Sequence, residues 1–233
     1  FVPPCPDDSG AAIGTAADAS RAAGGPLHLD WDTFAGLPVE DDLSAAPEGW
    51  VCSPLDLGGL SAAMAAGDVV AWMRGRAEIG PRALGHRSFL ADARRPAARD
   101  ELNRVKQREW FRPVAPMCRE HDLATWFDRA DPDPHMLTFR RVLDPARLGA
   151  VAHVDGTARV QSVDEAALPT MSALLSEHQR RTGVGVLCNT SLNHPGRGFV
   201  NRTTDLLALC ELRGVRHAVV EDRWFRATDG GSW

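Results

Sequence analysis

The chain has 233 residues, a formal net charge of -5 and an ordinary hydrophobic content of 44%. No apolar run approaches the roughly 20 residues that a membrane-spanning helix needs, and no signal peptide is visible. The five cysteines are scattered without a CxxC pair, which favours free thiols in a cytoplasmic protein over a disulfide framework or a structural zinc site. Because the first residue is Phe1, we expect a fragment or a processed form, although a stand-alone subunit stays open.

Positive charge is concentrated in one part of the chain. The segment 74–112 holds eleven basic residues against five acidic ones, so the rest of the chain carries about -11. A small anionic ligand fits such a focused island better than a long nucleic-acid track, which usually makes a whole domain basic. Lys106 is the one lysine among 26 basic residues, and a lysine offers a compact charge that an arginine does not.

The pattern along the chain predicts helices and strands in alternation, and therefore an α/β fold with a mixed sheet. A helix is expected over 7–25, followed by a linker poor in apolar residues over 26–49. The remaining predicted helices cover 58–67, 96–107, 120–127, 171–183 and 203–214, the last capped by Thr203 or Thr204. The predicted strands or extended segments cover 68–74, 111–117, 135–142, 157–163, 184–189 and 217–222, the last being the final strand.

The stretch GRAEIGPRALGHRSFLADARRP, residues 75–96, follows a buried strand and has neither helical nor strand periodicity. It carries Arg76, Arg82 and Arg87 between glycines. Glycines let the backbone approach an anion closely, and arginine offers a planar fork for phosphate. A solvated loop of surface arginines explains the same pattern equally well, so the spacing alone leaves both interpretations open.

Two further segments carry candidate ligand contacts. In LNRVKQREWFRPVAP, Lys106 ends a helix, and alternation in an extended segment would point Arg108, Trp110 and Arg112 to one side. Lys106 could instead only complement the helix dipole.

The third segment is CNTSLN, which follows a buried strand and offers hydrogen-bonding groups for phosphate or ribose oxygens, namely Asn189, Thr190, Ser191 and Asn193. Ordinary turn chemistry is the alternative for these residues. Arg159, in DGTARVQ, is a possible fourth cation, although Asp155 could serve as its structural partner.

Taken in order, GRAEIGPRALGHRS, LNRVKQREWFRPVAP, DGTARVQSV and TGVGVLCNTSLN resemble the C-terminal part of the O-carbamoyltransferase (NodU/CmcH) family. The resemblance implies a YrdC-like fold over 50–228, in which a twisted mixed sheet is flanked by helices. It also implies that 26–49 is a linker and that 1–25 is the end of an actin-like-ATPase-fold domain that transfers the carbamoyl group.

The family chemistry that the resemblance implies is the formation of carbamoyl adenylate from carbamoyl phosphate and ATP with Mg²⁺. A missing or separate transfer domain would then deliver the carbamoyl group to a hydroxyl of a small acceptor in antibiotic or nodulation-factor-type biosynthesis. We expect neither a membrane nor a nucleic acid as partner. The alternatives are an inactive or partner-dependent fragment and a YrdC-like module that binds a nucleotide or RNA.

The resemblance also assigns site residues. Lys106, Arg112 and Arg82 would be catalytic, and the nucleotide and phosphate contacts would come from Arg159, Ser191, Asn189, Asn193, Arg87 and Arg76. Asp8 would be one ligand of an incomplete metal site, and Fe²⁺ or a similar divalent ion is expected only with the missing N-terminal domain.

Overall fold

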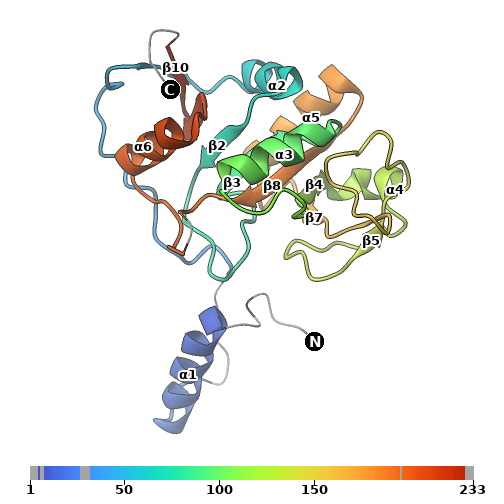
Figure 1. Ribbon diagram of the computed structural model, residues 1–233. Helices are drawn as coiled ribbons and strands as arrows, with labels where there is room; N and C mark the ends of the chain where they lie inside the picture. Colours follow the sequence, from blue (N-terminus) through green and yellow to red (C-terminus); the bar gives the residue numbers. More distant parts are fainter. Residues whose placement is uncertain (1–4, 6–7, 27–31, 195, 229–233) are drawn as a thin grey trace.

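An eight-stranded mixed sheet forms the centre of the molecule, and the computed structural model describes residues 5, 8–26, 32–194 and 196–228 (Figure 1). The strand order is β1-β10-β9-β2-β3-β8-β4-β7, with parallel pairing of β9 with β2 and of β4 with β7 and antiparallel pairing elsewhere. These strands are β1 Trp50–Pro54, β2 Val70–Met73, β3 Arg87–Asp92, β4 Ala115–Arg119, β7 Gln161–Val163, β8 Val186–Ser191, β9 His217–Val220 and β10 Arg223–Ala227. A separate two-stranded sheet pairs β5 Arg140–Arg141 with β6 Thr157–Ala158.

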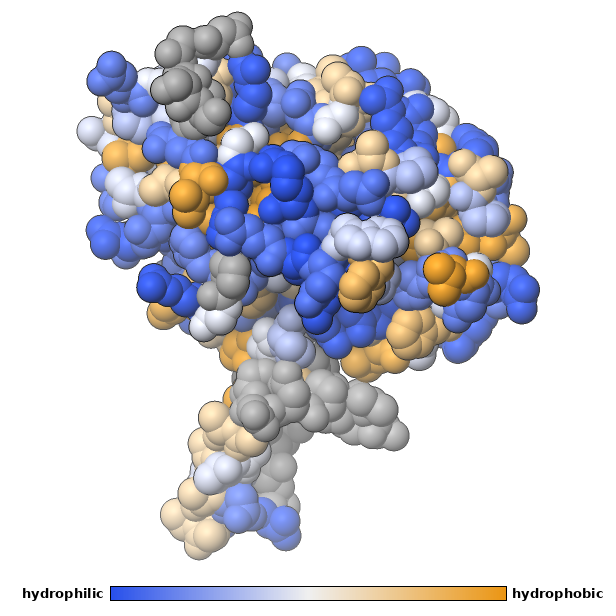
Figure 2. Space-filling model, viewed as in Figure 1, coloured by the Kyte–Doolittle hydropathy of each residue, from blue (hydrophilic) through white to orange (hydrophobic). Residues whose placement is uncertain are grey.

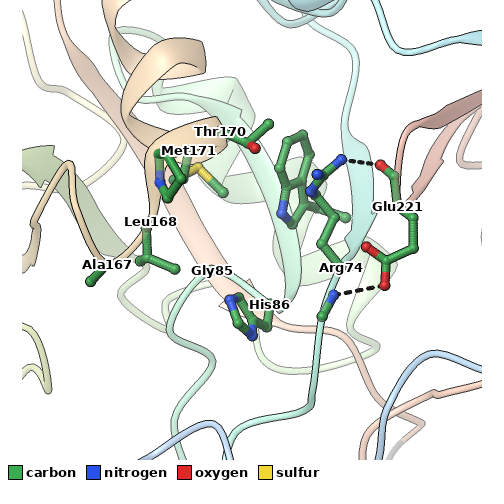
Figure 3. Close-up of a pocket in the computed structure, with 11 residues that line it drawn as sticks. Arg74, Gly85, His86, Ala167, Leu168, Thr170, Met171 and Glu221 are labelled. Carbon is green, nitrogen blue, oxygen red and sulfur yellow. Dashed lines mark hydrogen bonds between the residues drawn. The ribbon is translucent and has the colours of Figure 1, made fainter.

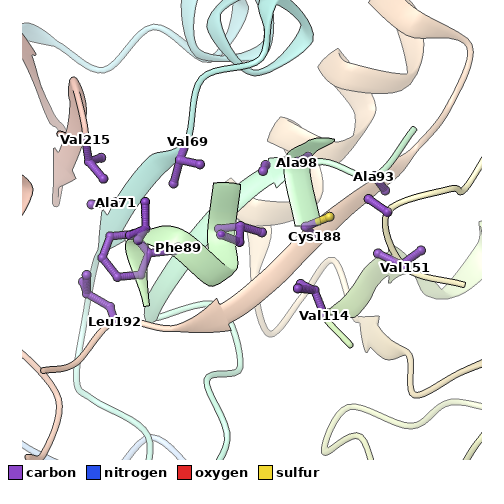
Figure 4. Close-up of a cluster of buried hydrophobic side chains, with 14 of the residues drawn as sticks. Val69, Ala71, Phe89, Ala93, Ala98, Val114, Val151, Cys188, Leu192 and Val215 are labelled. Atoms are coloured by element: carbon purple, nitrogen blue, oxygen red, sulfur yellow. The ribbon is translucent and has the colours of Figure 1, made fainter. Parts of the chain in front are cut away.

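Helices cover both faces of the large sheet. The helices that do so are α2 Leu57–Ala66, α3 Pro96–Val105, α5 Pro169–Thr182 and α6 Thr203–Arg213. The other helical segments are α1 Asp8–Ala22, a 3-10 turn Glu120–Asp122 and α4 Leu123–Trp126. Along β2, Ala71 and Met73 enter one hydrophobic cluster, whereas Val70 and Trp72 enter the other, as the alternation of a strand requires. The first cluster packs under α3 and α6 and the second under α2 and α5 (Figure 4 shows part of the first).

The α/β class with a mixed sheet between helices is confirmed. Glycines end α2 at Gly67 and α5 at Gly183, as the sequence predicts, and Pro96 opens α3. The cap of α6 differs, because Arg202 occupies the N-cap position in place of Thr203 or Thr204.

The largest error concerns residues 75–96. They are not one loop, because Arg87–Asp92 forms β3, a strand near the middle of the sheet whose six residues are all buried. A strand buried on both faces has no polar-apolar alternation, so its pattern does not show in the sequence. Strands β1 and β10 were missed as well, and β9 is therefore not the final strand.

Helix α1 and the segment between α1 and β1 differ in how they contact the rest of the molecule. Helix α1 is largely exposed and projects away from the sheet (Figure 1). The described part of the predicted linker instead contacts the sheet region, because Ile79 N donates to Thr33 O and Glu40 N donates to Asn201 O.

Hydrophilic residues predominate on the face shown in Figure 2. Trp110 and Phe111, both exposed, contact each other edge to face. The thiols of Cys52, Cys118, Cys188 and Cys210 are free, in agreement with the prediction. Over the described residues, no helix combines the length and the apolar character that crossing a bilayer requires.

A buried polar group links β3 to helix α5. The Asp92 carboxylate accepts bonds of 2.6–3.0 Å from the Arg94 guanidinium, and Nε2 of His178 lies 3.6 Å from its Oδ1. Burial alone would raise the pKa of Asp92, but the His178 ring and the hydrogen bonds from Arg94 hold it below its usual value. A carboxylate with a depressed pKa stabilises the fold above its unfolded pKa, near 4, and this stability is lost as the pH falls.

Asp92→Asn should therefore lower the free energy of unfolding by about 2 kcal/mol at pH 7, because a charged hydrogen-bond acceptor is lost. The difference in the free energy of unfolding between Asp92→Asn and the wild type should narrow by about 1.4 kcal/mol per pH unit below about pH 4. In that range the Asp92 carboxyl of the unfolded wild type takes up a proton. Urea unfolding at pH 7 and pH 3 measures both values. Asp100→Asn, at an exposed carboxylate, is the control, and an equal gap at the two pH values would contradict this role of Asp92.

Candidate functional site

A small cavity of about 110 Å³ lies where β8 ends and β4 begins. Segments far apart in sequence meet there, because β8 pairs with β4 in an antiparallel register that places Asn189 opposite Ala115. The cavity is lined by Pro81, Arg82, Ala83, Arg108, Pro113, Val114, Ala115, Met136, Arg159, Asn189, Thr190 and Ser191. Three of the lining side chains are guanidinium groups, and none of the described residues that line the cavity is a carboxylate.

The arginines of this cavity repel one another. Burial lowers the pKa of Arg159, and the neighbouring charge of Arg82 lowers it further. Burial likewise lowers the pKa of Arg108, with an additional contribution from Arg112. Nη2 of Arg108 and Nε of Arg159 are buried and have no hydrogen-bond partner among the described residues. A buried guanidinium N–H donor without an acceptor costs free energy, so the arrangement favours binding of an anion with several oxygens.

The loop 80–86 carries Arg82 and is held by buried polar side chains. Glu78 Oε1 accepts hydrogen bonds from the backbone N–H groups of Leu84 and His86. Gln161 Nε2 donates to Leu84 O at 2.7 Å, and Asn189 Nδ2 donates to Ala83 O at 2.9 Å. The Asn189 amide thus fixes the loop, and only its Oδ1 has no hydrogen-bond partner among the described residues.

Arg108 is positioned by a turn and not by a strand. Asn103, buried in α3, accepts from Arg108 Nε at 2.6 Å and donates to the carbonyl oxygens of Trp110 and Arg112. Gln107 has a positive φ of 49°, which turns the chain after α3. The predicted alternation of Arg108, Trp110 and Arg112 along an extended segment is therefore wrong, since only Arg108 of the three lines the cavity.

Lys106 lies directly behind Ser191. Its ammonium group donates to Ser191 O at 2.6 Å and to Ser191 Oγ at 3.1 Å, and it also donates to Asn193 Oδ1. Burial lowers the pKa of Lys106 to about 8, assisted by the charges of Arg108 and Arg213. Lys106 is thus a cation whose hydrogen bonds reach the cavity through Ser191, with Asn193 in the same network.

Arg159 lies at a break between two strands. The predicted strand 157–163 is divided into β6 and β7, which belong to different sheets, and Arg159 falls between them. Asp155 accepts hydrogen bonds from Thr157. The carboxylate whose charge raises the pKa of Arg159 is Asp133, which itself accepts hydrogen bonds from the backbone of Leu137 and Thr138.

Besides Lys106 and Asn193, three predicted site residues lie outside the cavity lining. Arg87 is fully buried and donates to Asn201 Oδ1 and to the carbonyl oxygens of Arg74, Gly75, His86 and Leu37, so it supports the fold and does not face a ligand. Arg76 donates to Ala35 O. Arg112 is half exposed and pairs with Glu109 at 3.1 Å, one residue before Pro113 of the cavity wall.

The metal prediction has no counterpart in the described part of the chain. Asp8 is the first residue of α1, and its side chain lies outside the described residues. Among the residues that are described, no group of three or more His, Cys, Asp or Glu side chains could hold a metal ion. The structure gives no support for an Fe²⁺ site within them.

The structure thus brings together Arg82, Arg159, Asn189 and Ser191, with Lys106 and Asn193 behind them. Arg108 and Thr190 also line the cavity. The sequence offers both within their segments, Arg108 two residues after Lys106 and Thr190 within CNTSLN, but nothing in it gives either residue a role of its own.

Comparison with known proteins agrees with this fold and shows the family. Residues 61–227 match the family model described as the carbamoyltransferase C-terminus. The chain is 51% identical over 230 residues to 3'-hydroxymethylcephem-O-carbamoyltransferase of Streptomyces clavuligerus, which covers 99% of this chain and 44% of that protein. It is 40% identical to nodulation protein U of Rhizobium fredii, over 97% of this chain and 38% of that protein.

Among solved structures, full-length HypF in a phosphate- and nucleotide-bound form matches with a TM-score of 0.53 at 16% identity, over 72% of this chain and 25% of that one. HypF has a YrdC-like domain, so the predicted YrdC-like fold is confirmed. The chain spans less than half the length of these curated relatives. By the match over 61–227, the chain belongs to the family of carbamoyltransferase C-terminal domains.

Proposed function

We propose that this chain is the activating part of an O-carbamoyltransferase and forms carbamoyl adenylate from carbamoyl phosphate and ATP. Water cleaves carbamoyl phosphate to carbamate and phosphate, and a carbamate oxygen then bonds to the α-phosphorus of ATP while pyrophosphate leaves. The family match and the names of the carbamoyltransferase relatives support the transfer of a carbamoyl group. Delivery to a small-molecule hydroxyl is proposed for the longer protein of which this chain corresponds to the C-terminal part.

The observation that carries the proposal is the cavity with three guanidinium groups and no carboxylate among the described lining residues. The reaction brings two phosphorylated reactants that repel each other into one site. Catalysis of such transfers depends on positioning and on cations directed at developing charge. A fixed cluster of arginines provides both functions before the substrates arrive.

The side chains divide this work by their chemistry. Arg82, Arg108 and Arg159 would hold phosphate oxygens, because a guanidinium can form two parallel hydrogen bonds to them. Ser191 Oγ lies on the same wall and would bond to a phosphate or acyl oxygen, whereas Asn189 Oδ1, an acceptor, would bond to an N–H donor of the substrate. Lys106 would exchange part of its contact with Ser191 for a substrate oxygen, as a mobile point charge. Mg²⁺ would enter with the ATP phosphates and reduce their negative charge.

Arg112 fits this scheme as a residue of the cavity entrance. Its side chain is more than half exposed, and the one ion pair with Glu109 is weak at such an exposed position. It can therefore leave Glu109 and contact a bound phosphate without breaking the fold. This keeps Arg112 as a candidate catalytic residue, although in the structure it does not line the cavity.

Removing one cation should reduce pyrophosphate release strongly. With ATP, Mg²⁺ and carbamoyl phosphate, we expect Lys106→Ala, Arg108→Ala and Arg112→Ala each to lower kcat/KM about tenfold to hundredfold, the loss of one charge-assisted contact. Arg180→Ala, which removes an exposed arginine from α5, should leave the rate within twofold. Circular dichroism melts check that each variant folds.

The site assignment fails if the wild type releases pyrophosphate and the three variants do so at the same rate. If the folded wild type gives no pyrophosphate at any substrate concentration, the chain alone is not the activating enzyme. Tight RNA binding with a steep dependence on salt, and no turnover, would support a nucleic-acid module instead.

The rate should also depend on the protonation of Lys106. Because the pKa of Lys106 is lowered to about 8, the ammonium loses its proton as the pH rises through that value. We expect kcat/KM to fall above about pH 8 and Lys106→Arg to move this fall to a much higher pH, since arginine stays charged. A pH profile of pyrophosphate release from pH 6 to 10 measures the shift, and an unchanged alkaline fall in Lys106→Arg would show that another group titrates.

A further inference from the structure

Residues 33–37, which we call the strap, pair with the backbone on both sides of Glu78. Ala77 N donates a hydrogen bond to the strap at 2.8 Å, and Ala77 O accepts one from it at 2.9 Å. On the other side of Glu78, Ile79 N donates to Thr33 O at 2.7 Å. The strap lies in the predicted linker and outside the residues that match the family model. These three bonds fix the peptide that carries Glu78.

Side chains of the strap also reach the far end of the loop 80–86 and the wall of the cavity with three guanidinium groups. The Phe34 ring packs on the His86 ring, with the ring centroids 3.9 Å apart and the ring planes inclined by 31°. Thr33 is buried, and its Oγ1 lies 3.1 Å from Nε2 of His135, whose neighbour along the chain lines that cavity. The strap is therefore packed against the elements that form the cavity.

Glu78 connects the strap to the loop 80–86. The residue is 4% exposed, and its Oε1 accepts hydrogen bonds of 2.5–3.3 Å from the backbone N–H groups of Leu84, His86 and Arg87. A carboxylate accepts stronger hydrogen bonds than a neutral amide does. Its Oε2 is buried without a hydrogen-bond partner among the described residues, so the bonds that the carboxylate makes within them all go to this backbone.

Both ends of the segment that contains the loop are fixed separately. At its start, the Glu221 carboxylate accepts from Gly75 N at 2.9 Å, and the Arg74 guanidinium donates to Glu221 O (Figure 3). At its end, Arg87 begins β3 within the sheet. The freedom that remains lies between these ends, in the residues that the strap and Glu78 hold.

The position of Arg82 depends on this restraint. Near the two ends of the loop 80–86, Gly80 has a φ of 109° and Gly85 a φ of 99°, and the backbone of glycine rotates more freely than that of other residues. Arg82 is exposed between them, and the charge of Arg159 repels it. Repulsion and hydration of the guanidinium both favour a loop that moves out of the cavity, so the loop has to be held against them.

We propose that the strap and Glu78 position Arg82 for the proposed reaction. The strap fixes the peptide of Glu78, and the Glu78 carboxylate fixes the backbone of the loop 80–86, which sets where the Arg82 guanidinium lies. The inference rests on the proposed function, because the place of Arg82 affects turnover only if Arg82 holds phosphate oxygens. Part of the predicted linker 26–49 then belongs to the activating unit.

A double-mutant cycle tests whether Glu78 acts through Arg82. Glu78→Gln keeps the shape of the side chain and removes the charge that strengthens its hydrogen bonds. In pyrophosphate release by the 233-residue chain, we expect it to lower kcat/KM about tenfold. In the Arg82→Ala background the same substitution should change kcat/KM less than about twofold, because no guanidinium is left to misplace. In the Arg159→Ala background the loss of about tenfold should persist.

Equal losses in the Arg82→Ala and Arg159→Ala backgrounds would overturn the inference, since a general effect of Glu78 on the fold does not distinguish two arginines. An unchanged kcat/KM for Glu78→Gln in the otherwise wild-type chain would overturn it as well. Circular dichroism melts check that each variant folds at the assay temperature.

The strap is tested by Gly36→Ala. A Cβ at Gly36 would lie 2.6 Å from the backbone oxygen of Ala77, so the strap has to shift away from the peptide next to Glu78. We expect kcat/KM to fall at least about fivefold, and this loss to disappear in the Arg82→Ala background. Gly14→Ala, in α1, is the matched control, because its added Cβ meets nothing within 4 Å.

The Gly36→Ala cycle decides the question if Glu78→Gln does not fold, and a loss that is the same with and without Arg82 would then overturn the inference. If the folded wild type shows no turnover, the proposed function fails. The affinity for ATP with Mg²⁺, measured by isothermal titration of the same variants, then shows whether Glu78 and the strap act through Arg82.

Discussion

The structure depends on holding several positive charges close together in a place that water only partly reaches. Arg82, Arg108 and Arg159 surround one small cavity, and Lys106 lies behind its wall. Partial burial and mutual repulsion disfavour this arrangement and lower the pKa values of Lys106, Arg108 and Arg159. The rest of the fold must offset that cost, and an anionic ligand removes it.

Hydrogen bonds of neutral amides and of one carboxylate hold the segments that carry these cations, and so contribute to offsetting the cost of gathering the charges. Asn103 fixes the turn of Arg108, and Asn189 with Gln161 fixes the loop of Arg82. Glu78 binds backbone N–H groups of that loop and does not neutralise the cavity. The supporting residues therefore hold the cations in place and leave their charge available for a ligand.

The sequence predicts the elements whose signals are local. The glycines after α2 and α5 and the proline at the start of α3 end or begin helices by backbone chemistry, and these predictions are confirmed. Strand β3 was missed because a strand buried on both faces has no alternation. The segment of charge excess, 74–112, contains Arg82 and Arg108 of the cavity, but composition cannot separate Arg82, which lines the cavity, from Arg87, whose donors all serve the fold. That distinction depends on long-range pairing of β3 with β2 and β8, which no local pattern contains.

Equilibrium binding of ATP tests the central claim most directly. Isothermal titration of the chain with ATP and Mg²⁺ should show one saturable site, and Arg159→Met should weaken it at least tenfold. Arg141→Met, at an exposed arginine of β5, should bind ATP as the wild type does. Equal affinity of the wild type and Arg159→Met, or no saturable binding to the folded wild type, would contradict a cavity that gathers these cations for a phosphorylated substrate.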